Sequence, residues 1–159
     1  MESIDFNSLG AEAVIALIQE SLSGDNEKIQ RSTKVLKAYS KHRASIGTLS
    51  FILTNASQLA HRQMAAVLLK RNLVNLYSAL APQEQAEFRQ ILLGQYVKEP
   101  SLLVQKGIAT LISILRPIVE IKNWGELQQL LDQAIKSAPN SAATFVLLNS
   151  ILYHFKAPK

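Results

Sequence analysis

The side chains best suited to chemistry in this chain of 159 residues are basic and polar groups spread over successive amphipathic segments. Lys and Arg together number 17 and Asp and Glu 12, so the formal net charge is +5. Such side chains can bind acidic or carbonyl groups of a partner protein. The candidate partner-binding residues are Lys28, Arg31, Arg62, Gln63, Lys70, Arg71 and Lys106.

Each group of these candidates also has a purely structural interpretation. Arg62 and Gln63 can contact a partner, or Arg62 can brace the neighbouring helix pair. Lys70 and Arg71 stand near the end of a predicted helix, where cations interact favourably with the helix dipole. Lys28 and Arg31 can belong to a solvated face, and Lys106 is a weaker member of the same set. The residues alone leave these alternatives open.

The sequence offers little for catalysis or for metal binding. It contains no G-x-x-x-x-G-K-[ST], G-x-G-x-x-G, H-E-x-x-H or G-x-S-x-G pattern. The absence of cysteine excludes a thiolate metal site. His42, His61 and His154 are scattered over different predicted helices, and we expect each to be a surface or capping residue. We therefore expect a protein that is not an enzyme and that uses no cofactor and no metal.

Membrane and nucleic-acid functions are also disfavoured. The first residues lack the basic and apolar regions of a signal peptide. The longest apolar run, Gly107–Leu115, falls short of the roughly 18 residues that span a bilayer. We therefore expect a soluble intracellular protein without membrane insertion. No block of five or more Lys and Arg occurs, so nucleic-acid binding rests on the net charge alone.

Apolar residues recur at helical spacing along almost the whole chain. Residues 61–73 show the pattern best, because Ala65, Leu68, Leu69 and Leu73 form one apolar stripe. After a loose lead-in over residues 1–10, the breaks and stripes predict helices over 11–22, about 26–42, 45–53, about 58–77, from 81–82 to a break at 99–101, about 101–116, from about 124 onward, and 141–155. Trp124 is expected to be a core residue.

These eight helices are expected to form four antiparallel pairs. The second helices begin near residues 26, 58, 101 and 141, which gives spacings close to the period of about 40–47 residues of HEAT and armadillo repeats. Because one pair cannot bury its apolar faces alone, neighbouring pairs should stack. The pattern thus favours an all-α solenoid of about four HEAT repeats over a bundle of two layers of four helices.

At this point a family resemblance becomes visible. The run Arg62-Gln63-x-Ala65-x-x-x-Leu69-Lys70 resembles the "R-Q-x-A-x-x-x-L-K" helix of the importin-beta N-terminal domain. Asn123-Trp124-x-Glu126-Leu127 is similar to the "W-P-E-L" start of a fourth-repeat helix, with Gly125 in place of the usual Pro. Residues 15–36 resemble the opening of the domain. The resemblance covers nearly the whole chain and looks closest to the importin four branch of the superfamily.

The resemblance implies the N-terminal arch of a nuclear import receptor. In that family the arch is a right-handed HEAT solenoid, and the small GTPase Ran binds in its GTP form to the concave face of the second, or B, helices and thereby controls cargo release. Residues 11–159 would be the HEAT domain, as a fragment of a longer solenoid. Cargo would bind later repeats, nucleoporins would bind the full-length protein, and the receptor would shuttle between cytoplasm and nucleus through the nuclear pore.

The seven candidate residues named above would then be Ran contacts. The main alternative is a generic HEAT-repeat scaffold that binds other proteins without depending on Ran.

Overall fold

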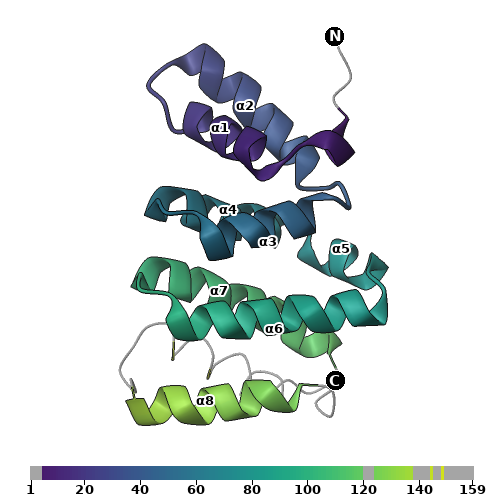
Figure 1. The fold of residues 1–159 in the computed structure, drawn as a ribbon, viewed down its shortest axis with the longest axis vertical. Coiled ribbons are helices and arrows are strands. Elements are labelled where there is room, and N and C mark those ends of the chain that lie inside the picture. Colours follow the sequence, from purple (N-terminus) through teal and green to yellow (C-terminus); the bar gives the residue numbers. More distant parts are fainter. Residues whose placement is uncertain (1–4, 120–123, 138–143, 145–147, 149–159) are drawn as a thin grey trace. The chain divides into compact units, whose positions relative to one another are not determined.

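The computed structural model describes residues 5–119, 124–137, 144 and 148. Within them the chain is α-helical, with short 3-10 turns and no strand. Contacts divide the chain into two compact units, Met1–Ala79 and Leu80–Lys159. The helices are α1 (Ala11–Ser21), α2 (Asn26–Tyr39), α3 (Ser45–Asn55), α4 (Leu59–Arg71), α5 (Leu73–Ala79), α6 (Pro82–Lys98), α7 (Leu102–Leu115) and α8 (Gly125–Ser137) (Figure 1).

The first unit consists of two stacked helix pairs and the short helix α5. α1 packs along α2, and α3 packs along α4; α1 also contacts both α3 and α4, so that the second pair stacks on the first. The core between them is apolar, and Ile18, Leu49 and Leu53 have no exposed surface. Burying such stripes on both sides is what makes each pair depend on its neighbour.

The lead-in to the first unit is more ordered than the sequence predicts. Phe6–Ser8 form the 3-10 turn η1, in which the Asp5 carboxylate accepts a hydrogen bond from the backbone N–H of Asn7 at 3.1 Å. The Phe6 ring lies edge-on to the rings of Tyr39 and His42, with both centroid distances 5.4 Å. An aromatic contact of this geometry ties the lead-in to the end of α2.

The predicted helix over 58–77 is wrong in one respect: it is two helices. α4 ends at Arg71, the backbone of Asn72 leaves the helical region (φ −132°, ψ 28°), and α5 starts at Leu73. Asn competes with helical backbone hydrogen bonding through its short amide side chain, which makes a break at this position favourable. The apolar stripe survives the break, since Leu69 and Leu73 are both buried.

The second unit is built on the pair α6 and α7, and α8 packs against α6. Pro82 occupies the first position of α6, where its missing N–H costs nothing, and the Glu84 carboxylate accepts from the backbone N–H of Ala81 at 3.0 Å. α7 ends at the 3-10 turn η2 (Arg116–Ile118), which contains Pro117, as the sequence predicts. Trp124 is buried, which confirms its expected place in the core.

Most large apolar side chains of the described helices are buried, and a few are exposed. The exposed ones in the second unit include Ile91, Leu103 and Ile135. Leu103 lies in the first turn of α7. Leu22, expected in the first helix, lies just past the end of α1 and is 52% exposed. The predicted helix 141–155 lies outside the described residues except for 144 and 148.

The all-α class and the helix pairing of HEAT repeats are confirmed. The second helices of the described pairs, α2, α4 and α7, begin at Asn26, Leu59 and Leu102, within a residue of the predicted starts. Stacking of successive pairs within the first unit is the arrangement of a solenoid rather than of two crossed layers.

Candidate partner-binding face of the second helices

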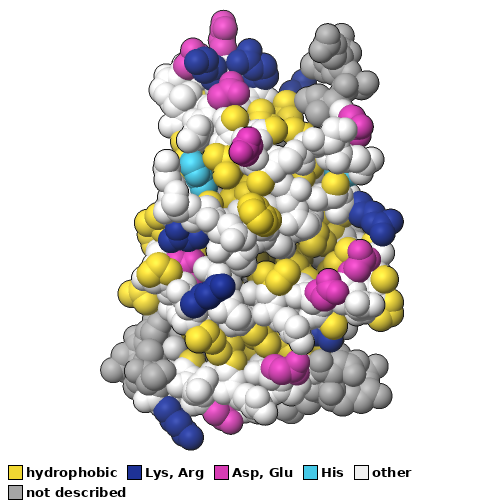
Figure 2. Space-filling model, in the orientation of Figure 1, with side chains coloured by type: hydrophobic (Ala, Val, Ile, Leu, Met, Phe, Trp, Pro, Cys, Tyr) yellow, Lys and Arg dark blue, Asp and Glu magenta, His cyan; other side chains and the backbone are white. Residues whose placement is uncertain are grey.

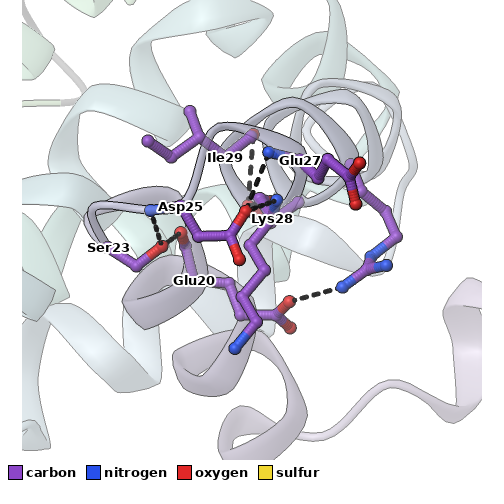
Figure 3. Close-up of polar contacts among 8 residues, drawn as sticks. Glu20, Ser23, Asp25, Glu27, Lys28 and Ile29 are labelled. Carbon is purple, nitrogen blue, oxygen red and sulfur yellow. Dashed lines mark hydrogen bonds and ion pairs between the residues drawn. The ribbon is translucent and has the colours of Figure 1, made fainter.

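A side-chain cap at Asp25 fixes the start of α2, the helix that carries the candidate residues Lys28 and Arg31. The Asp25 carboxylate accepts from the backbone N–H groups of Glu27 (3.0 Å) and Lys28 (3.3 Å), and the Asp25 carbonyl accepts from the N–H of Ile29 at 2.9 Å (Figure 3). Asp25 is itself held by Ser23, whose hydroxyl accepts from its N–H at 3.4 Å. These bonds satisfy helix donors that otherwise lack partners.

Lys28 and Arg31 both lie exposed on the first half of α2. The Arg31 guanidinium forms an ion pair with Glu20 of α1 at 3.2 Å, with side-chain exposures of 66% and 35%. An ion pair this exposed to solvent contributes little to stability, because water and salt screen it. Arg31 therefore remains accessible to a partner, and a partner that binds it would replace only the weak ion pair with Glu20.

Arg62 has a structural task in the loop that precedes α4. Its guanidinium Nη1 donates to the backbone carbonyls of Ala56 at 2.9 Å and of Ser57 at 3.3 Å. No side chain caps the start of α4 at Gln58, so this clamp is what fixes the entry of the chain into the helix. These two bonds brace its own helix pair, between the α3–α4 loop and α4.

Gln63, Lys70 and Arg71 are exposed along α4. Lys70 and Arg71 occupy the last turn, where the unpaired carbonyl groups of the helix end give a partial negative charge that cations stabilise. Because the helix ends at Asn72, both cations lie at a helix terminus, and the interaction with the helix dipole is a structural reason for their presence. That interaction leaves both side chains exposed to solvent.

The structure does not bring all the candidates together. Within the first unit, the α1–α2 and α3–α4 loops lie at one end of the helix pairs, so α2 and α4 run in the same direction (Figure 1). Lys28, Arg31 and Gln63 therefore lie toward the end with these loops, and Lys70 and Arg71 toward the opposite end. Lys106 is exposed on α7, in the second unit.

The histidine predictions are confirmed for one residue and wrong for another. His42 is a local cap, because its Nδ1 accepts from the backbone N–H of Ala44 at 3.1 Å. His61, expected at the surface, is only 5% exposed. It stands one turn before Ala65 on the same side of α4 and so shares the buried face, a periodicity that the sequence contained. His154 lies outside the described residues.

Buried polar groups in the second unit were not expected from the sequence. Glu99 is 6% exposed; its carboxylate accepts from Gln95 Nε2 and from the backbone N–H of Ser101, both at 3.0 Å. Gln105 Nε2 donates to the Tyr96 carbonyl at 2.9 Å. Together these bonds hold the α6–α7 turn. The Glu-Pro-Ser sequence at 99–101 was the available signal, since a Ser before a helix and an acid beside it often cap.

Arg116 is a second buried charge of this unit. It is 4% exposed, and its Nη1 donates to the Val119 carbonyl at 3.0 Å. Removal from water lowers the pKa of its guanidinium. The hydrogen bond closes the η2 turn, so the residue has a structural role of its own.

In the described part of the chain, no three His, Asp or Glu side chains come together as a metal site would require. None of the helices described is both long and apolar enough to cross a membrane.

Comparison with known proteins shows which family the chain resembles. Residues 32–98 match the model of the importin-beta N-terminal domain. The chain is 27% identical to Importin-4 of Mus musculus over 138 residues, which is 86% of this chain and 13% of that protein. It is 27% identical to Importin-4 of Homo sapiens over 113 residues (71% and 10%) and 28% identical to Transportin-1 of Oryza sativa subsp. japonica over 130 residues (80% and 14%).

The chain spans between 10% and 14% of the length of these curated relatives. The matched domain runs from the middle of α2 to the end of α6 and contains the whole of α4, on which the resemblance was first recognised. The similarity to two Importin-4 proteins also agrees with the branch that the sequence motifs indicated. Residues 32–98 therefore match the importin-beta N-terminal domain, and the chain is similar to members of the importin-beta superfamily.

Proposed function

We propose that residues 11–159 are the N-terminal HEAT-repeat region of a nuclear import receptor and that this region binds Ran in its GTP form. The observation that carries the proposal is the match to the importin-beta N-terminal domain over residues 32–98, together with relatives named importin and transportin. In such a receptor, Ran binding would control cargo release, later repeats would bind cargo, and nucleoporins would guide passage between cytoplasm and nucleus.

The exposed polar residues of the second helices are the proposed contacts. Lys28, Arg31 and Gln63 would contact Ran near one end of α2 and α4, and Lys70 with Arg71 near the other. A GTPase is a large partner, and a specific interface of about 800 Å² per partner easily extends over both ends of two short helices. Arg62 acts differently in this proposal, since it already donates to two loop carbonyls. It would position the start of α4, and so Gln63, and Lys106 would add a contact from α7.

The test is a calorimetric titration of the chain with Ran that carries either a GTP analogue or GDP, at physiological salt. The proposal expects binding to the GTP form only. Binding should weaken strongly in Lys70→Glu with Arg71→Glu, because two attractive contacts become repulsive.

A matched control is Lys98→Glu with Lys136→Glu. Both lysines are exposed in the last turns of α6 and α8, so the control reproduces the same charge change and the same loss of favourable dipole interaction. Binding of both nucleotide forms with equal affinity would refute the Ran proposal and favour the alternative, a HEAT scaffold for other proteins. Equal weakening by the control pair would refute the proposed site at the end of α4.

A further inference from the structure

The net charge of the chain is concentrated on α2 and the turn that follows it. Residues 26–43 contain six basic residues and one acidic residue, a local net charge of +5, which equals that of the whole chain; the other 141 residues hold equal numbers of each sign. Basic and acidic side chains lie together near the start of this region, because Asp25 and Glu27 are at the start of α2 and Glu20 of α1 pairs with Arg31; Figure 2 shows both colours at this end of the first unit. Toward the end of the region only cations follow.

The lysines toward the end of α2 form one surface, here called the α2 lysine face and made up of Lys34, Lys37 and Lys41. All three are exposed. A spacing of three residues places Lys34 and Lys37 on the same side of consecutive helical turns, and Lys41 lies in the turn just after the helix. Arg31 has Glu20 as an ion-pair partner, but within the described residues no carboxylate lies within ion-pair distance of the α2 lysine face.

Helix stability does not explain this face. The dipole favours Lys37, which lies in the last turn. Lys34, however, has Arg31 three residues before it and Lys37 three residues after it, and such like-charged neighbours destabilise a helix. An acidic residue at position 34 would be better for α2. The chain thus keeps a charge that its own fold does not use.

We propose that the α2 lysine face binds an acidic peptide segment of a partner protein, independently of any nucleotide-dependent contact. Acidic side chains would supply the counter-charges that the fold lacks. Lys34 and Lys41 are seven residues apart, about 10 Å at the rise of a helix, which an extended acidic segment of about three residues matches. This binding goes beyond the proposed function and does not depend on it.

The surroundings of the face favour a peptide over a nucleic acid or a membrane. The only aromatic residue of α2, Tyr39, is fully buried, so no ring is available for base stacking. No large apolar side chain of α2 is exposed, whereas a helix that lies on a membrane needs an apolar face directed at the lipid.

The experiment measures fluorescence polarisation of a labelled hepta-glutamate peptide titrated with the whole chain, at about 0.05 M and about 0.2 M salt. The variant is Lys34→Glu with Lys37→Glu, and the control is again Lys98→Glu with Lys136→Glu. We expect the α2 variant to weaken peptide binding at least about fivefold and the control less than about twofold, since each exposed charge pair contributes little alone. Higher salt should weaken binding of the unaltered chain.

Thermal unfolding of Lys34→Glu separates binding from structure. The single variant should melt at the temperature of the unaltered chain or above it, because its new carboxylate would lie between Arg31 and Lys37. A lower melting temperature would overturn the argument that the fold does not use Lys34. Three binding results would overturn the proposal: no binding of the peptide at low salt, equal weakening by the control, or tighter binding of a single-stranded DNA of the same charge.

Discussion

The cap at Asp25 gives a prediction whose size can be worked out from the structure. The Asp25 carboxylate accepts one good hydrogen bond, from the N–H of Glu27 at 3.0 Å, and one long bond, from the N–H of Lys28 at 3.3 Å. Asp25→Ala removes both and leaves these donors to water. Loss of an N-cap of this kind costs about 1 kcal/mol, and the lost carboxylate removes a favourable interaction with the helix dipole of about 0.3–1 kcal/mol.

The expected total is therefore roughly 1–2 kcal/mol of unfolding free energy. For a chain of this length, each kcal/mol lowers the melting temperature by about 2–4 °C. Asp25→Asn separates the two contributions, because Asn caps about as well as Asp but carries no charge. It should lose only the dipole interaction, and that smaller loss should shrink as salt is added.

Urea unfolding followed by far-ultraviolet circular dichroism measures both variants. The midpoint should fall for Asp25→Ala while the slope with urea stays unchanged, since the surface exposed on unfolding is the same. If Asp25→Ala and Asp25→Asn are equally unstable, the hydrogen bonds of the cap contribute nothing and the reasoning fails. A loss well above 3 kcal/mol for Asp25→Ala would also refute it, because no cap accounts for so much.

Three further changes test other parts of the structure. Leu69→Ala, at a side chain that is 1% exposed, should cost about 3 kcal/mol of unfolding free energy, whereas Val67→Ala, at 47% exposed, should change it by less than about 0.5 kcal/mol in the same urea titration. Burial raises the pKa of Tyr39 above its usual 10.0, so the unfolded chain loses that proton first, and stability should fall more steeply above about pH 10 in the unaltered chain than in Tyr39→Phe. Arg62→Lys should lose most of the roughly 1 kcal/mol that Arg62→Ala loses in thermal unfolding, because an ammonium group does not reproduce the guanidinium contacts with two loop carbonyls.

Periodicity predicted most of the fold because the helix faces are determined locally. Ala65, Leu68, Leu69 and Leu73 recur at helical spacing, and all four are buried as predicted. The break at Asn72 was missed for the same reason: the stripe continues across it, and an apolar pattern does not record the backbone angle of a polar residue between two of its members.

The roles of the candidate residues were harder to predict. The sequence does not show whether a basic side chain is exposed to solvent or bonded to another part of the chain. Arg62 and Lys70 occupy one motif, yet the first clamps a loop and the second is exposed in the last turn of the helix. Arg62 donates to two backbone carbonyls, and because every residue has a backbone carbonyl, the sequence does not indicate which ones accept these bonds. His61 shows the opposite case, since its spacing from Ala65 indicated burial and its polarity alone suggested the surface.

The two ends of the second helices differ in how far structure already accounts for their charges. At the start of α2 and α4, Arg31 and Arg62 each have a partner within the chain, an exposed carboxylate for one and loop carbonyls for the other. At the end of α4, Lys70 and Arg71 have no ion-pair partner among the described residues and interact with the diffuse field of the helix terminus. A partner that binds the end of α4 therefore breaks no specific bond of the described residues. A partner that binds the guanidinium of Arg62 must first break its hydrogen bonds to the α3–α4 loop. For this reason, charge reversal at the end of α4 should report on binding, and substitution of Arg62 should report first on folding.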